Sequence, residues 1–173
     1  NAILPNVDGL FAIDSVGGNL VISTNAMLTD ISGIAGVTYI GEDLEIAEND
    51  LLTEITGPFA IEFIPRDLLI FSNPALTSLS GLSSITAVGE DLRINNNTSL
   101  PTLSGLEGIS SVGQSLNINS NDLLTDLTGL SGITSVGLNL YIGFNDALTD
   151  LSGLENITTV GLNLKLFYNE ILT

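Results

Sequence analysis

The chain contains no cysteine, histidine or tryptophan, and only 3 lysine and arginine residues stand against 20 acidic residues. The absence of cysteine excludes disulfides and thiolate metal sites. The absence of histidine excludes a Ser-His-Asp triad, a Cys-His pair and imidazole metal ligands. The net charge of −17 argues against nucleic acid and anionic membrane surfaces, because both attract clustered lysine and arginine.

Long hydrophobic runs are also missing. No apolar stretch approaches the ~18 residues of a membrane span, so we expect no membrane insertion. The chain opens Asn-Ala-Ile-Leu-Pro, without the basic start and apolar stretch of a signal peptide. Because 44% of the residues are nevertheless hydrophobic, a packed core is available despite the acidity.

A period of 24 residues organises the whole chain. Leucine recurs three residues after each periodic asparagine, and glycine recurs eight residues after most of them. The period divides the chain into turns 1–24, 25–48, 49–72, 73–96, 97–120, 121–144 and 145–168, with a partial turn at 169–173. Such self-similarity predicts one repeat domain over residues 1–173, whose stacked turns share one core.

The turn 121–144 shows the internal pattern, with aliphatic residues at 124, 127, 130, 133, 136, 140 and 142. The last two, Leu140 and Ile142, are two residues apart, which places both side chains on one face of a β-strand. The steps of three suit a 3₁₀-like or irregular arc, not a sustained α-helix. The pattern predicts a β-rich, right-handed solenoid with one long parallel β-sheet and few or no helices.

The periodic asparagines follow the predicted strand, where the chain turns a corner. Their amides can donate to and accept from backbone groups of the same and adjacent turns. We therefore predict a structural ladder formed by Asn25, Asn49, Asn73, Asn97, Asn121, Asn145 and Asn169. The glycine columns predict corners with positive φ or tight stacking of turns.

Two segments carry a family resemblance. The run NITTVGLNLKLFYNEIL, residues 156–172, resembles the receptor L-domain repeats of insulin- and EGF-receptor ectodomains. The run LTSLSGLSSITAVGEDLRINNN, residues 76–97, is similar to related leucine-rich repeats of fungal cell-wall and bacterial surface proteins. The resemblance implies a receptor L-domain-like, leucine-rich-repeat coil and a role outside the cell or at its surface. It is specific for fold and weak for function.

The outward positions of the predicted strands vary most within the repeat. They hold two of the three cations and several aromatic residues, which are typical anchors of interfaces. We predict a ligand-binding face that includes Phe71, Arg93, Tyr141, Phe144, Lys165, Phe167 and Tyr168. The alternative is that an unconstrained surface drifts in composition.

Serine and threonine form further columns. One contains Thr29, Thr53, Thr77, Thr125 and Thr149, a second Ser32, Thr56, Ser80, Ser104, Thr128 and Ser152, and a third Thr86, Ser110, Thr134 and Thr158. Regular hydroxyl arrays are typical of ice-binding proteins. The stronger interpretation is that these hydroxyls satisfy backbone groups at turns.

Acidic residues also gather in one stretch, at Glu42, Asp43, Glu45, Glu48, Asp50 and Glu54. Such a cluster could hold Ca²⁺, but no calcium-loop motif accompanies it, so a solvated acidic surface is favoured. No nucleophile with its base, metal motif or phosphate loop is present either. We expect no enzyme, no cofactor and no metal.

The sequence as a whole predicts an extracellular or cell-surface recognition or adhesion module whose partner is a protein or glycan. The alternatives are a structural segment that assembles into a filament or surface layer, by end-to-end self-association, and an ice-binding protein. Uncapped ends predict a fragment of a longer array, with Leu4, Leu20 and Ile22 bare at one end. Pro58 and Pro65 interrupt the third turn and predict a local bulge there.

Overall fold

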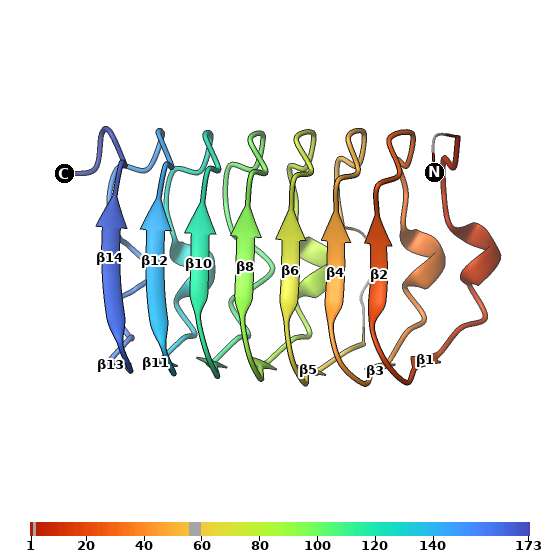
Figure 1. Cartoon of the computed structure of the whole chain (residues 1–173), viewed down its shortest axis with the longest axis horizontal. Helices are drawn as coiled ribbons and strands as arrows, with labels where there is room; N and C mark the ends of the chain where they lie inside the picture. The colour runs from red at the N-terminus through yellow and green to blue at the C-terminus, as the bar shows by residue number, and fades with distance from the viewer. Residues whose placement is uncertain (2, 56–59) are drawn as a thin grey trace.

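The computed structural model describes residues 1, 3–55 and 60–173 and is a β-solenoid with almost no helix (Figure 1). One face carries a seven-stranded parallel sheet in the order β14-β12-β10-β8-β6-β4-β2. Its strands are β2 (Leu20–Ser23), β4 (Leu44–Ala47), β6 (Leu68–Phe71), β8 (Leu92–Asn95), β10 (Leu116–Asn119), β12 (Asn139–Gly143) and β14 (Asn163–Phe167). Paired residues are 24 apart, as in Leu116 with Leu140, which confirms the predicted strand face and its period.

The predicted long sheet is present, and short strands, which were not predicted, build further parallel ladders along the edge where the chain enters the long strands. A five-stranded sheet joins β5 (Phe63–Ile64), β7 (Ala87–Val88), β9 (Ser111–Val112), β11 (Ser135–Val136) and β13 (Thr159–Val160). A two-stranded sheet joins β1 (Ser15–Val16) and β3 (Tyr39–Ile40). Each short strand is two residues long and contributes one inward aliphatic side chain, so the alternation typical of strands is too brief to read from sequence.

Short 3₁₀ helices occupy the arc opposite the long sheet, as the steps of three predict. They are η1 (Asp8–Leu10), η2 (Ser32–Ile34), η3 (Ser80–Leu82) and η4 (Thr128–Leu130). Each begins after a residue whose φ lies between −109° and −118°. No helix in the described part of the chain has the length and apolarity needed to cross a bilayer.

One continuous hydrophobic core runs along the solenoid axis. The inward aliphatic side chains of the described residues between Leu28 and Leu148 are at most 3% exposed. The burial of each such side chain contributes roughly 1.5–3 kcal/mol of gross transfer free energy, so this burial is the main favourable contribution to the stacking of the turns. Ile22 is also buried, at 6% exposure, so the expectation that it is bare is wrong, whereas Leu4 and Leu20 are only partly covered.

The predicted asparagine ladder is present. Asn49, Asn73, Asn97, Asn121 and Asn145 have no exposed surface, and Asn25 is 8% exposed. The side-chain oxygen of Asn97 accepts a hydrogen bond from the backbone N–H of Asn73 at 3.1 Å. Its side-chain nitrogen donates to the carbonyl of Ile70, one turn earlier, at 3.0 Å. The arrangement recurs through Asn169, so these amides join consecutive turns where the strands end.

The glycines serve mainly for tight stacking. A Cβ built on Gly113, Gly137 or Gly161 would lie 1.9 Å from the carbonyl oxygen of the glycine one turn earlier. Positive φ angles occur at Gly105 and Gly153, both +109°. The regular left-handed corner instead falls on non-glycine residues, which the sequence did not reveal: Thr24, Glu48, Ser72, Asn96, Ser120, Phe144 and Tyr168.

The third turn departs from the others at Pro65. The equivalent glycines donate their N–H groups to the turn before, as Gly89 does to Ile64 at 2.9 Å. Proline has no N–H to donate, and the short-strand ladder is interrupted there, between β3 and β5. The predicted irregularity at Pro58 and Phe59 lies outside the described residues.

Candidate functional site

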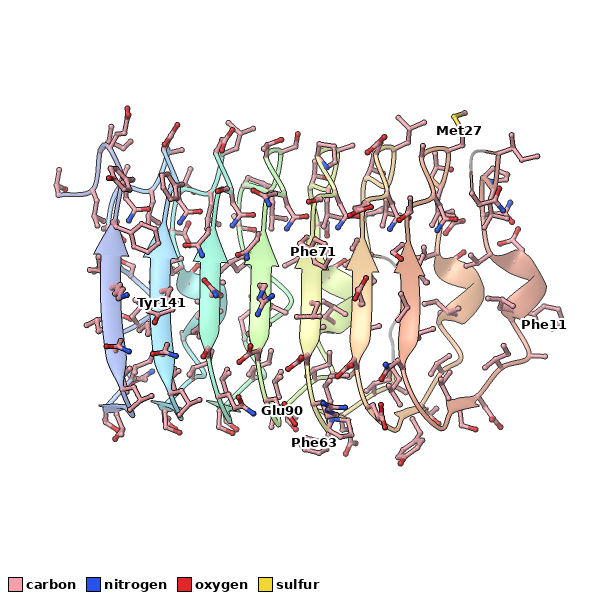
Figure 2. The ribbon with its side chains drawn as sticks, in the orientation of Figure 1. Phe11, Met27, Phe63, Phe71, Glu90 and Tyr141 are labelled. Atoms are coloured by element: carbon pink, nitrogen blue, oxygen red, sulfur yellow. The ribbon has the colours of Figure 1, made fainter. Side chains whose placement is uncertain are left out.

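The outward face of the long sheet brings together five of the seven residues predicted to bind a ligand. Tyr141 on β12 pairs in register with Lys165 on β14. The Lys165 ammonium lies 5.1 Å from the centre of the Tyr141 ring, within range of a cation–π interaction. Figure 2 shows Tyr141 on this face, which Phe71 shares further toward the N-terminus.

An aromatic cluster lies where β12 and β14 end, and it consists of Phe144, Phe167 and Tyr168. The rings of Phe144 and Tyr168 are stacked, with centroids 4.8 Å apart and an interplanar angle of 15°. Phe167 meets Phe144 edge to face at 5.4 Å. Phe144 is 45% exposed and Tyr168 is 73% exposed, so much of this aromatic surface faces solvent.

Gly143 makes room for part of this cluster. A Cβ at Gly143 would lie 2.4–2.6 Å from ring atoms of Phe167, its partner in register on β14. The Phe167 ring therefore covers the preceding strand. Phe71 follows the same rule, since its partner in register is Ala47, which is only 1% exposed.

Phe144 and Tyr168 occupy the left-handed corner with φ angles of 54° and 51°. Bulky side chains rarely adopt this conformation, and the cost is of order 1–3 kcal/mol for each residue. Other turns fill the same corner with Thr24, Glu48 or Ser72, so the backbone there does not require an aromatic ring. Two exposed rings at strained positions are therefore a feature that the solenoid itself does not explain.

Phe71 and Arg93 form a separate group. They lie diagonally on neighbouring strands, because Leu69 pairs with Arg93 and Phe71 with Asn95. The guanidinium of Arg93 is held by Asp91 at 3.2 Å, and its Nε is buried without a hydrogen-bond partner. Strand β10 separates this pair from Tyr141, and it presents two side-chain amides, Asn117 and Asn119.

A second ladder of side chains was missed by sequence reasoning. In the first four turns, the residue that precedes the long strand accepts a hydrogen bond from the backbone N–H of its equivalent one turn later. In the next two turns, Ser115 and Asn139 accept a side-chain amide of the following turn instead. The backbone N–H of Asp67 donates to the Asp43 side chain at 3.1 Å, and that of Asp91 donates to Asp67 at 2.8 Å. The signal was present in the sequence as a column in phase with the repeat: Asn19, Asp43, Asp67, Asp91, Ser115, Asn139 and Asn163.

Arg66 lies among these carboxylates and bridges the turns on both sides. Its guanidinium is 3.6 Å from the carboxylate of Glu42 and 3.4 Å from that of Glu90. The negative charges of Glu90, Asp43 and Glu42 raise the pKa of Arg66 above its ordinary value. This edge of the solenoid therefore favours a guanidinium.

The hydroxyl columns are largely used within the protein. The hydroxyl groups of the first column donate to the backbone carbonyl 24 residues earlier at 2.9–3.3 Å, in Thr29, Thr77, Thr125, Thr149 and Thr173. The third column does the same at 2.9–3.2 Å, in Thr38, Thr86, Ser110, Thr134 and Thr158. These bonds agree with the local interpretation of the columns. Thr56 lies outside the described residues.

In three turns of the second hydroxyl column, at Ser32, Thr128 and Ser152, an aspartate two positions earlier accepts a hydrogen bond from the backbone N–H of the column residue. Asp126 accepts from both the hydroxyl and the N–H of Thr128, and the hydroxyl bond is the main cause of the lowered pKa of Asp126. Ser152 lowers the pKa of Asp150 in the same way. These carboxylates stabilise the entry into the arc.

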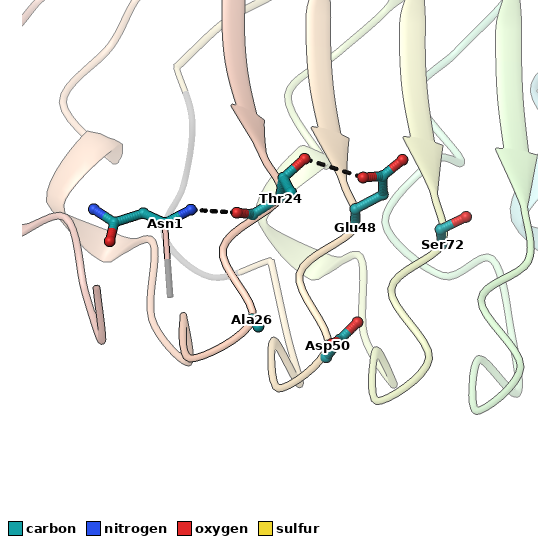
Figure 3. A pocket seen from close by; sticks show the side chains of 6 residues that line it. All are labelled: Asn1, Thr24, Ala26, Glu48, Asp50 and Ser72. Atoms are coloured by element: carbon teal, nitrogen blue, oxygen red, sulfur yellow. Dashed lines mark hydrogen bonds between the residues drawn. The ribbon is translucent and has the colours of Figure 1, made fainter. Parts of the chain in front are cut away.

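An acidic hollow lies beside the left-handed corners of the first three turns, and Figure 3 shows the residues that line it. The Thr24 hydroxyl donates to the Glu48 carboxylate at 3.0 Å, and the amino group of Asn1 donates to the Thr24 carbonyl. Asp50 and Ser72 complete its polar lining. Within the residues that the structure describes, no three acidic side chains converge closely enough to hold a metal ion.

Comparison with known proteins found no match to any family model, to any curated protein or to any solved structure.

Proposed function

We propose that the chain is an extracellular or cell-surface recognition or adhesion module, not an enzyme, and that it binds a protein or glycan on the outward face of its long sheet. The observation that carries the proposal is the pair of stacked, exposed rings of Phe144 and Tyr168 at strained left-handed positions. The corner has a positive φ in every turn, so the fold sets the backbone there, but it does not require aromatic side chains at this position. Exposed aromatic residues that the fold does not require are typical anchors of interfaces.

The surroundings of these rings suit recognition. Aromatic residues and arginine dominate the energetics of protein interfaces. The side-chain amides of Asn117 and Asn119 lie on β10, immediately beside Tyr141 and Gly143 on β12. The Asn119 amide is turned inward, with a buried oxygen and a nitrogen that donates to Asn117. Amides both donate and accept hydrogen bonds, so the half-buried Asn117 together with the exposed rings can satisfy the hydroxyl groups and apolar faces of a sugar as well as a peptide.

The repeat supports the same class of protein. The 24-residue register and the leucine-rich core fit the resemblance to receptor L-domain and surface leucine-rich repeats. Proteins of that type present variable side chains on a regular sheet. In this chain the outward columns vary in the same way, from Glu45 through Leu69, Arg93 and Asn117 to Tyr141.

The test is a double substitution, Phe144→Ser with Tyr168→Ser, because serine occupies this corner in other turns and should preserve the fold. Binding would be measured on a glycan array and on immobilised extracellular-matrix proteins. We expect the strongest signal of the unmodified chain to fall at least tenfold, since two anchors contribute about 2 kcal/mol or more.

Thr24→Ser, in the same corner at the other end of the sheet, is the matched control and should bind normally. If the double variant binds within a factor of two of the unmodified chain, or if the unmodified chain binds nothing on either surface, the proposed function is wrong.

A second candidate function is end-to-end assembly into a filament or surface layer. At the C-terminal end of the solenoid a hollow is lined only by core aliphatics: Leu140, Leu151, Leu154, Ile157, Val160, Leu164 and Leu166. Leu164 is 61% exposed, and β14 is the edge strand of the long sheet. The open edge of β2 at the other end could continue the same register, and a head-to-tail contact of this kind propagates.

A further inference from the structure

The seam between the second and third turns is open on the side of the short strands. The pairings described by the structure join β1 to β3 and β5 to β7, but not β3 to β5. The hydrogen bond from the backbone N–H of Arg66 to the Glu42 carbonyl measures 3.4 Å. The equivalent bond one turn later, from the backbone N–H of Glu90 to the Arg66 carbonyl, measures 2.8 Å. On the opposite side the seam is closed, because β4 and β6 pair in register along their whole length.

Pro65 explains the opening in two ways. It has no N–H to donate to the carbonyl of Ile40, although the glycine at this position makes the equivalent bond in other turns. It also carries a Cβ. At Gly41, one turn earlier, a Cβ would lie 2.2 Å from the Gly17 carbonyl oxygen, so a proline cannot approach its neighbour as closely as a glycine does. The third turn must stand away from the second at this edge.

The opening leaves backbone groups free. In the other turns the carbonyls equivalent to Thr38 and Ile40 accept N–H groups from the following turn, as Glu62 does from Thr86 at 2.8 Å. Among the described residues no backbone N–H reaches the carbonyl of Thr38 or Ile40, and the N–H of Glu62 has no backbone partner across the seam. Acceptors therefore outnumber donors in the gap.

A cleft occupies this seam. It is lined by Thr38, Tyr39, Ile40, Glu62, Phe63 and Pro65. Tyr39 and Phe63 hold the same position in adjacent turns and are 56% and 50% exposed. Figure 2 places Phe63 at the edge formed by the short strands, away from Phe71 and Tyr141 on the long sheet. The cleft is thus separate from the proposed strand-face site.

We propose that this cleft binds the guanidinium group of an arginine side chain presented by a basic segment of a partner protein. A guanidinium is planar, carries five N–H donors and no acceptor, and stacks on aromatic faces. The walls supply the rings of Tyr39 and Phe63, and the free carbonyls of Thr38 and Ile40 and the carboxylate of Glu62 supply acceptors. The net charge of −17 attracts a basic partner.

The neighbouring Arg66 supports this assignment. Its guanidinium already lies between Glu42 and Glu90, one residue from Pro65, and these two carboxylates neutralise it. Arg66 therefore does not oppose a second cation in the cleft. A neutral sugar fits less well, because the Thr38 hydroxyl already donates to the Asp14 carbonyl at 3.1 Å and Pro65 offers no donor.

The test uses an uncharged-ended nonapeptide of glycine and serine with one central arginine, and the same peptide with citrulline in its place. Citrulline has nearly the same shape but no charge. Each peptide is titrated into the isotope-labelled chain while the amide signals of residues 38–41, 61–64 and 66 are followed by NMR. We expect saturable shifts with the arginine peptide and at least tenfold weaker binding with the citrulline peptide.

Two variants locate the site. Pro65→Gly restores the residue type of the other turns and should close the seam, and Tyr39→Ser with Phe63→Ser uses the residue found at Ser15, Ser111 and Ser135. Each variant should bind the arginine peptide at least tenfold more weakly than the unmodified chain does. If the new amide of residue 65 still exchanges freely in Pro65→Gly, the seam has not closed and the serine variant decides.

Tyr141→Asn, which copies Asn117 on the strand face, is the control and should bind the arginine peptide normally. Equal binding of both peptides, equal binding by all variants, or no shift at millimolar arginine peptide would overturn the proposal. Because Tyr141 lies on the long sheet and the stacked rings lie where β12 and β14 end, failure here leaves the strand-face proposal standing, and the reverse holds as well.

Discussion

Asn97→Ala provides the most direct test of what holds the turns in register. Asn97 has no exposed surface, and its side chain makes three hydrogen bonds. The substitution leaves the buried N–H of Asn73 without its acceptor and the carbonyl of Ile70 without the amide donor. Each buried polar group that loses its partner costs about 1–3 kcal/mol. We therefore expect the free energy of unfolding to fall by about 3 kcal/mol.

Urea unfolding followed by circular dichroism measures this change. With an m-value of about 2 kcal/mol/M, the midpoint should move down by roughly 1.5 M. Asn163→Ala is the matched control, because its exposed amide makes a single bond to Asn139 at 2.8 Å. That variant should change stability by less than about 0.5 kcal/mol. If the two variants unfold at the same urea concentration, the ladder does not stabilise the solenoid.

Two further predictions follow from the stacking of the turns. Gly113→Ala should lower the free energy of unfolding by about 1–3 kcal/mol, because its Cβ would lie 1.9 Å from the Gly89 carbonyl oxygen. The control is Gly17→Ala, whose Cβ meets no atom within 4 Å and which should be neutral or slightly stabilising in the same urea experiment. Equal effects of the two substitutions would contradict the stacking argument. End-to-end assembly predicts that the weight-average mass in sedimentation equilibrium rises steadily with concentration. Leu164→Glu should abolish the rise, because Leu164 lines the exposed apolar end. A monodisperse monomer at all concentrations would exclude this second candidate function.

Much of the fold could be predicted from the sequence because its period has no insertion. The asparagines, the leucines and the strand pair Leu140 and Ile142 set the register, and translation by 24 residues then places every inward side chain in one core. The ladder role of Asn97 could also be predicted, since an in-phase amide after a strand has few other uses. Five of the predicted site residues are neighbours for the same reason: residues 24 apart lie side by side.

Other features depend on contacts that no spacing reveals. The short sheet arises because two-residue strands are stabilised by their neighbours, and the left-handed corner falls on residues such as Glu48 and Phe144, which give no glycine signal. Phe71 and Arg93 separate from the other site residues because strand β10 lies between them and Tyr141.

The sequence by itself determined the period, the inward core and the asparagine ladder, since these follow from residue type repeated in phase. Only the tertiary structure decided which outward residues are free to act. The Phe167 ring is folded over Gly143, and Lys165 is held against Tyr141, whereas Phe144 and Tyr168 remain open to solvent. The sequence shows Pro65 only as a break in a glycine column, whereas the structure shows that this break opens the seam between two turns. The effect of a missing N–H and an added Cβ depends on the turn against which they pack.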